Sequence, residues 1–171
     1  MLTRASRARI EKDGYVLNIN ISGRNGVPSP GVYREAGKCG NLPSGEAYIA
    51  PLEDGSDGEM IIDGSMVGIG KLESPLHMTI SGGKLRSVTG EKSGNLDILL
   101  KNEINGTVCE LGIGTNEAAI LNGIILEDEK VYGTVSYRLW YQHFFLAEQT
   151  KQNAIWMESS CVRLYIWMIQ K

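Results

Sequence analysis

Short runs in which apolar and polar residues alternate dominate the first 135 residues of the chain. Residues 7–12 and 15–22 alternate well enough to predict two strands, joined at Asp13-Gly14, a dipeptide typical of hairpin turns. Further strands are predicted at residues 47–50, 60–62, 65–71, 76–80, 84–88 and 108–112 and from Tyr132 onward. Apolar residues at helical spacing follow Ser93-Gly94, and one or two helical turns are predicted at 116–121. The expected fold is α+β: mostly antiparallel β-sheet, flattened and barrel-like, with one main helix near 95–102.

The composition of the chain changes abruptly near residue 133. All 21 glycines lie at or before Gly133, and the last 38 residues contain none. All three tryptophans and both phenylalanines lie after that point. A domain boundary is one explanation, but no linker marks it.

Charge and cysteine content limit the classes of function. The 17 basic and 20 acidic residues give a net charge of −3, and no basic stripe favours nucleic-acid binding. Three cysteines without metal-type spacing favour a reducing cytoplasm over a disulfide scaffold. No apolar run reaches the roughly 20 residues that a membrane helix needs, so no membrane partner is expected.

Two glutamates are the candidate site residues. Glu46 stands where a turn rich in Pro, Ser and Gly gives way to a strand, a position that fixes a carboxylate and leaves it accessible. Most exposed glutamates are only solvated surface groups. Glu110 lies inside an apolar strand, where an acid must be paired, protonated or bound to metal. His77 is expected on a strand face rather than as a ligand, because nothing near it completes a site.

Four blocks of sequence together resemble the aminopeptidase T / aminopeptidase S family of metallo-aminopeptidases, in the order and spacing of that family. They are residues 40–51, 58–64, 110–116 and 125–135, the last two reading Glu-Leu-Gly-Ile-Gly-Thr-Asn and Ile-Leu-Glu-Asp-Glu-Lys-Val-Tyr-Gly-Thr-Val. The resemblance implies an exopeptidase that holds two divalent metal ions (zinc, cobalt or manganese) with two glutamates, two histidines and an aspartate. The glutamates fall on Glu46 and Glu110. The resemblance also implies a peptide substrate, and a homodimer is a candidate assembly.

The histidine and aspartate blocks of the family are missing from the sequence as it stands. The first histidine is expected directly after Gly133-Thr-Val135, where this chain has Ser136. Regrouping the codons from Ser136 by one frame permits His-Ile-Ala-Tyr-Gly, and regrouping from Leu146 in the other frame permits His-Leu-Asp-Gly. The Asp-Gly pair is forced by Trp156-Met157-Glu158.

Residues 1–135 are therefore interpreted as a partial C-terminal metal-binding domain of the family, and residues 136–171 as a frameshifted tail. Residues 136–141 of the tail can still form strand, because Tyr and Trp favour it, whereas a loose helix or irregular segment is expected beyond Gln142. Two glutamates alone should bind divalent ions weakly, so the chain is expected to be an inactive fragment. Three alternatives stay open. They are a ring-cleaving non-haem iron dioxygenase of the same fold, a non-catalytic fragment or oligomer-contact module, and a divergent native C-terminal helix in place of the shifted tail.

The first testable prediction concerns the gene. Resequencing the encoding DNA across codons 130–171 should reveal a base insertion or deletion near codon 136 and a second one near the T-rich codons 143–146. An open frame that reproduces residues 136–171 without change in independent isolates would contradict the frameshift and favour a divergent tail.

Overall fold

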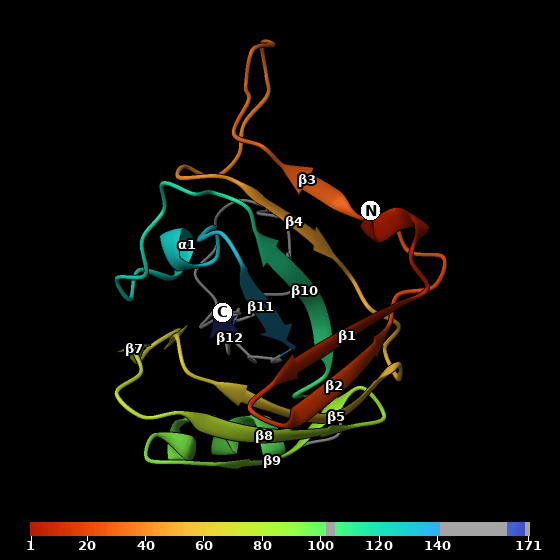
Figure 1. Cartoon of the computed structure of the whole chain (residues 1–171), viewed down its shortest axis with the longest axis vertical. Coiled ribbons are helices and arrows are strands. Elements are labelled where there is room, and N and C mark those ends of the chain that lie inside the picture. Colours follow the sequence, from red (N-terminus) through yellow and green to blue (C-terminus); the bar gives the residue numbers. More distant parts are fainter. Residues whose placement is uncertain (102–104, 141–163, 170–171) are drawn as a thin grey trace, which may run out of the picture.

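The computed structural model describes residues 1–101, 105–140 and 164–169, and the strands among them form two antiparallel β-sheets (Figure 1). This confirms the α+β, mostly antiparallel fold. The first sheet has five strands in the order β1 (Arg7–Lys12), β2 (Tyr15–Asn20), β5 (Ser56–Ile62), β8 (Leu76–Ser81) and β9 (Lys84–Thr89).

The second sheet contains the strands that carry the candidate site. Its order is β3 (Val27–Ser29), β4 (Glu46–Ile49), β10 (Val108–Gly114), β11 (Thr134–Leu139), β12 (Leu164–Ile169), β6 (Ser65–Met66) and β7 (Gly70–Lys71). Three short helices accompany the sheets: the 3-10 helices η1 (Leu2–Arg4) and η2 (Ser93–Leu100), and the α-helix α1 (Ile125–Asp128). None of the helices among these residues is long and apolar enough to cross a membrane.

The hydrophobic core lies between the two sheets and follows from strict alternation along the strands. In β11, Val135, Tyr137 and Leu139 are buried in the core, whereas Ser136 and Arg138 lie on the opposite face. The predicted first hairpin joins β1 and β2. Its turn residues Asp13 and Gly14 both have positive φ, as a two-residue type I′ turn requires. Core positions from both sheets include Leu17, Ile19, Ile49, Met60, Ile62, Met78, Ile80 and Leu111.

The main predicted helix is a 3-10 helix. Leu96 and Leu99 are both 1% exposed, and this spacing of three residues matches the 3-10 repeat rather than the α-helical one. Gly94, Asn95 and Asp97 are poor α-helix formers, which explains why packing of two leucines decides the local structure. Residue 102, the end of the predicted helix, lies outside the described residues.

Three other local predictions were wrong. The single strand expected at 65–71 is two short strands, β6 and β7, separated by a turn in which Gly68 has a φ of 79°. No helical turn forms at 116–121, and α1 at Ile125–Asp128 was not predicted. The last strand starts at Thr134 rather than Tyr132, because Gly133 adopts a φ of 81° in a turn.

The expectation of a flattened barrel also needs correction. Within the described residues the sheets stay open, with β1 and β9 at the edges of one and β3 and β7 at the edges of the other. They meet along one side instead, where the Val108 amide donates to the Gly83 carbonyl at 2.8 Å and the Leu85 amide to the Gly106 carbonyl at 2.8 Å.

The tail contributes strands, which agrees with the expectation for residues 136–141 but not with the helix or irregular segment expected beyond Gln142. Residues 136–139 continue β11, and residues 164–169 form β12, which pairs with both β11 and β6. Val135, Tyr137 and Leu139 alternate along the strand and suit a buried strand face. They can therefore pack in the sheet whether or not this segment is frameshifted. Residues 141–163, which include Trp156, lie outside the described part.

Tyr137 provides a stability test of this strand. It is 1% exposed, burial raises the pKa of its phenol well above the usual range, and its hydroxyl has no hydrogen-bond partner among the described residues. Tyr137→Phe should therefore stabilise the protein by about 1 kcal/mol, because an unsatisfied buried hydroxyl is removed. Tyr137→Ala should cost about 3–5 kcal/mol.

Urea denaturation measures both effects, with Tyr132→Phe as the control because Tyr132 is 65% exposed. A Tyr137→Ala variant as stable as the parent chain would mean that residues 136–139 do not belong to the core.

Candidate functional site

The two candidate glutamates lie on one face of the seven-stranded sheet. Glu46 begins β4 and pairs with Gly114 of β10, four residues beyond Glu110 on the same strand. Positions 110, 112 and 114 share one face of β10, and residues paired across an antiparallel ladder share a face as well. This face is opposite to the one that Leu111 and Ile49 turn to the core.

A cavity of about 370 Å³ lies over this face of the sheet, and Glu46 and Glu110 both line the cavity. The segment between β3 and β4 forms much of its wall, and the chain of that segment extends away from the sheets in Figure 1. The lining is predominantly polar and consists of Pro28, Ser29, Pro30, Tyr33, Cys39, Gly40, Asn41, Glu46, Tyr48, Glu110 and Arg138. The structure thus brings Glu46 and Glu110 together, and their role as metal ligands stays a prediction.

Position 136, where the resemblance expects a histidine, lies beside the same glutamates. Ser136 of β11 pairs with Gly112 of β10. A Cβ atom added to Gly112 would lie 2.2 Å from Ser136 Oγ and 3.8 Å from Glu46 Oε2. The absence of a side chain at Gly112 therefore lets the residue at position 136 extend over β10 toward Glu46.

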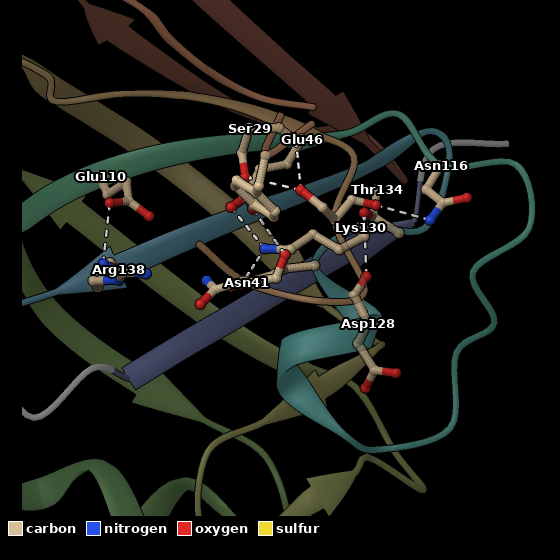
Figure 2. A network of polar contacts seen from close by, with 12 residues as sticks. Ser29, Asn41, Glu46, Glu110, Asn116, Asp128, Lys130, Thr134 and Arg138 are labelled. Carbon is tan, nitrogen blue, oxygen red and sulfur yellow. Dashed lines mark hydrogen bonds and ion pairs between the residues drawn. The ribbon is translucent and has the colours of Figure 1, made fainter. Parts of the chain in front are cut away.

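Glu46 is held by a fully buried lysine. Lys130 Nζ lies 2.6 Å from Glu46 Oε1, and the same ammonium contacts Glu129 Oε1. Lys130 is 0% exposed, Glu129 2% and Glu46 9%, so one cation serves two largely buried carboxylates. Figure 2 shows Lys130 beside Glu46. Such an arrangement depends on the cation, because removing Lys130 would leave two buried carboxylates without a counter-charge.

Glu129 is the member of this cluster whose pKa is shifted. Burial raises the pKa of its carboxyl to about 7, and the charge of Glu46 adds to the rise, while the hydrogen bond and charge of Lys130 oppose it. Its Oε2 atom has no hydrogen-bond partner among the described residues. The site thus contains a carboxyl whose protonation changes near neutral pH.

Backbone and side-chain contacts fix the turn that presents Lys130. Asp128 is fully buried and accepts hydrogen bonds from the Asn122 amide at 2.8 Å, the Gly123 amide at 3.0 Å and Ser65 Oγ at 2.5 Å. Asn116 links the turn to β4: its amide donates to the Lys130 carbonyl, and its Nδ2 donates to the Ser44 carbonyl, both at 2.8 Å (Figure 2).

Glu110 has a cation of its own. Arg138 pairs with Glu110 across β10 and β11, and Arg138 Nη1 lies 3.1 Å from Glu110 Oε2. The two side chains are 16% and 18% exposed, so this ion pair is only partly accessible to solvent. Each candidate carboxylate therefore already faces a positively charged side chain.

The described residues do not fit a centre for two metal ions. No three His, Cys, Asp or Glu side chains in residues 1–101, 105–140 and 164–169 gather closely enough to hold a metal. His77 lies in the other sheet, where its Nε2 is 3.0 Å from Glu59 Oε2, as expected for a strand-face histidine. His143 lies outside the described residues.

Sequence reasoning missed Lys130, Glu129 and Arg138 as members of the site. The charged run at 127–130 is typical of a solvated surface, since lysine and glutamate are rarely fully buried. Nothing in its local pattern indicates that Asn116, distant in sequence, folds the run inward. Arg138 had a weak signal, because it stands in a strand that pairs with the one containing Glu110.

Comparison with known proteins shows a shared fold. No family model matches the chain, and no curated protein matches its sequence. Among solved structures, it is similar to a 2,5-dihydroxypyridine dioxygenase from Pseudomonas putida KT2440, with a TM-score of 0.75 and 16% identity. It is also similar to wild-type AmpT, an aminopeptidase T from Thermus thermophilus, with a TM-score of 0.62 and 18% identity.

The chain corresponds to only part of each neighbour. The dioxygenase match covers 98% of this chain and 50% of the neighbour, and the AmpT match covers 78% and 36%. At these identities the similarity establishes the fold alone.

The pKa of Glu129 generates a prediction about pH. Below pH 4.5 the carboxyl is protonated in both the folded and the unfolded chain. As the pH rises from 4.5 to 7, only the unfolded chain releases this proton, so stability falls. The destabilisation reaches about 3 kcal/mol above pH 7. Glu129→Gln should remove it and be more stable than the parent at pH 8 but not at pH 4.5.

Urea denaturation across this pH range tests the difference, with Glu117→Gln as the control because Glu117 is an exposed acid. Identical pH profiles for the parent and Glu129→Gln would contradict the raised pKa.

Proposed function

We propose that this chain carries the metal-binding domain of a metal-dependent aminopeptidase and supplies two of its carboxylate ligands, Glu46 and Glu110. One observation carries the proposal. Both glutamates and position 136 lie on one face of the sheet, although they come from three different strands. This arrangement supports a single site for three ligand positions that are predicted from distant blocks of sequence.

The frameshift accounts for the ligands that this chain lacks. Regrouped codons permit histidine at position 136 and alanine at position 138. The shifted frame therefore removes a predicted ligand and also introduces the arginine that pairs with Glu110. The chain as given is proposed to be inactive, and its divalent metal is proposed to be zinc, cobalt or manganese in the repaired protein.

A peptide with a free N-terminus is the proposed substrate, and a homodimer and a cytoplasmic location are proposed with it. The chain spans half or less of its structural neighbours, so the complete enzyme is proposed to contain a further domain.

The second candidate is a ring-cleaving non-haem iron dioxygenase, favoured by the higher TM-score of the dioxygenase neighbour. Such enzymes typically hold one iron with two histidines and one carboxylate. Metal binding by both Glu46 and Glu110 would favour the aminopeptidase. Metal binding by at most one of the two glutamates would favour the dioxygenase.

Activity separates these proposals. The frame-corrected, full-length protein should release leucine from a leucine anilide when zinc, cobalt or manganese is added, and the present chain should not. Glu46→Gln and Glu110→Gln in the corrected protein should each reduce kcat/KM by at least about 100-fold, as expected for loss of a ligand.

Oxygen consumption with iron(II) and 2,5-dihydroxypyridine is measured in parallel. Oxygen uptake without peptidase activity would contradict the aminopeptidase proposal and support the dioxygenase proposal. Equal peptidase turnover by the present chain would contradict the assignment of the missing ligands.

A further inference from the structure

The ion pair between Arg138 and Glu110 has a consequence beyond the absence of a histidine. Arg138 Nη1 lies 3.1 Å from Glu110 Oε2, and Arg138 lines the same cavity as both glutamates. The guanidinium of arginine is a positively charged group. A metal ion that bound Glu110 would meet this fixed positive charge within a few ångströms.

The other glutamate is arranged differently. Lys130 binds Glu46 Oε1, whereas Oε2 is the oxygen that lies 3.8 Å from the Cβ position of Gly112, on the side where Ser136 extends. Lys130 lies before position 136 and is therefore common to this chain and to its frame-corrected form. Arg138 is the cation that the shifted segment adds.

Charge balance leads to the same conclusion. Among the ion pairs of the described residues, three carboxylates (Glu46, Glu110 and Glu129) face two cations (Lys130 and Arg138), which leaves an excess of at most one negative charge. Removing Arg138 raises the excess to at most two, which matches the charge of a divalent ion. Partly buried charges interact strongly because solvent screens them little.

We propose that Arg138 is an internal counter-ion that keeps divalent metal ions away from Glu110, so that restoring the missing histidine alone does not restore a metal site. The inference rests on the proposed function in taking Glu110 as a metal-facing carboxylate. It adds that Arg138 blocks the site independently of the lost ligand.

A double-mutant cycle tests this inference in the whole chain. Zinc binding is measured by isothermal titration calorimetry, and manganese binding by electron paramagnetic resonance, for the parent, Ser136→His, Arg138→Ala and the double variant. The double variant should bind one ion at least about tenfold more tightly than Ser136→His, corresponding to about 1.4 kcal/mol or more. The parent should bind no ion at Glu110.

Three controls keep the test specific. Ser136→His with Arg138→Lys retains the positive charge and should show no gain, whereas Ser136→His with Arg138→Gln keeps a polar side chain of similar length and should show the gain even if the alanine variant folds poorly. Arg24→Ala removes an equal charge from an exposed pair with Glu53, 2.8 Å apart, and should have no effect.

The possible results separate the two proposals. Equal affinities of Ser136→His with and without Arg138→Ala would overturn the role of Arg138 and leave the proposed function standing. An equal gain with Arg138→Lys would also overturn it, because the charge would then be irrelevant. No binding by any variant, together with an inactive frame-corrected protein, would overturn Glu110 as a ligand and the inference with it.

Discussion

The buried ammonium of Lys130 is the interaction on which this site depends. It lies between Glu46 at the start of β4 and Glu129 in the turn before β11, and all three side chains are almost completely removed from water. Burying three charged groups is costly, so the surrounding structure must hold them in place. Asp128 and Asn116 do so through hydrogen bonds that leave the 122–131 segment little freedom. The orientation of Glu46 is thus decided by residues more than 60 positions further along the chain.

The sheet was predictable from the sequence where local signals were complete. Alternation placed β1, β2, β8 and β9 almost at their observed bounds, and Asp13-Gly14 marked the turn between the first two. The prediction of a helix near 95–102 did not give the type of helix. Burial of Leu96 and Leu99 against the core, rather than intrinsic propensity, decides that type. The pairing of β12 between β11 and β6 had no local signal, since it joins segments about 100 residues apart.

The candidate site was predictable in part, from the local positions of two glutamates and from the resemblance. Glu46 and Glu110 could be chosen from their matched blocks, and the register of β4 against β10 explains why they face one cavity. The cations that neutralise them were not chosen, because a lysine in a charged run and an arginine in a strand have no pattern that separates a buried partner from a surface group. Burial of charge is a tertiary property, determined here by contacts with Ser44, Ser65 and Asn116.

The position of β12 also affects the order in which the protein can fold as it leaves the ribosome. The five-stranded sheet uses only residues 7–89 and mostly joins neighbouring hairpins, so it can form early on the emerging chain. β6 is synthesised within that interval and can pair with β7, yet its other partner, β12, is not available until residues 164–169 have emerged. During the intervening synthesis of about 100 residues, Ser65 and Met66 present an unpaired strand edge. In a nascent chain stalled in this interval, that edge would be open to pairing with a neighbouring chain.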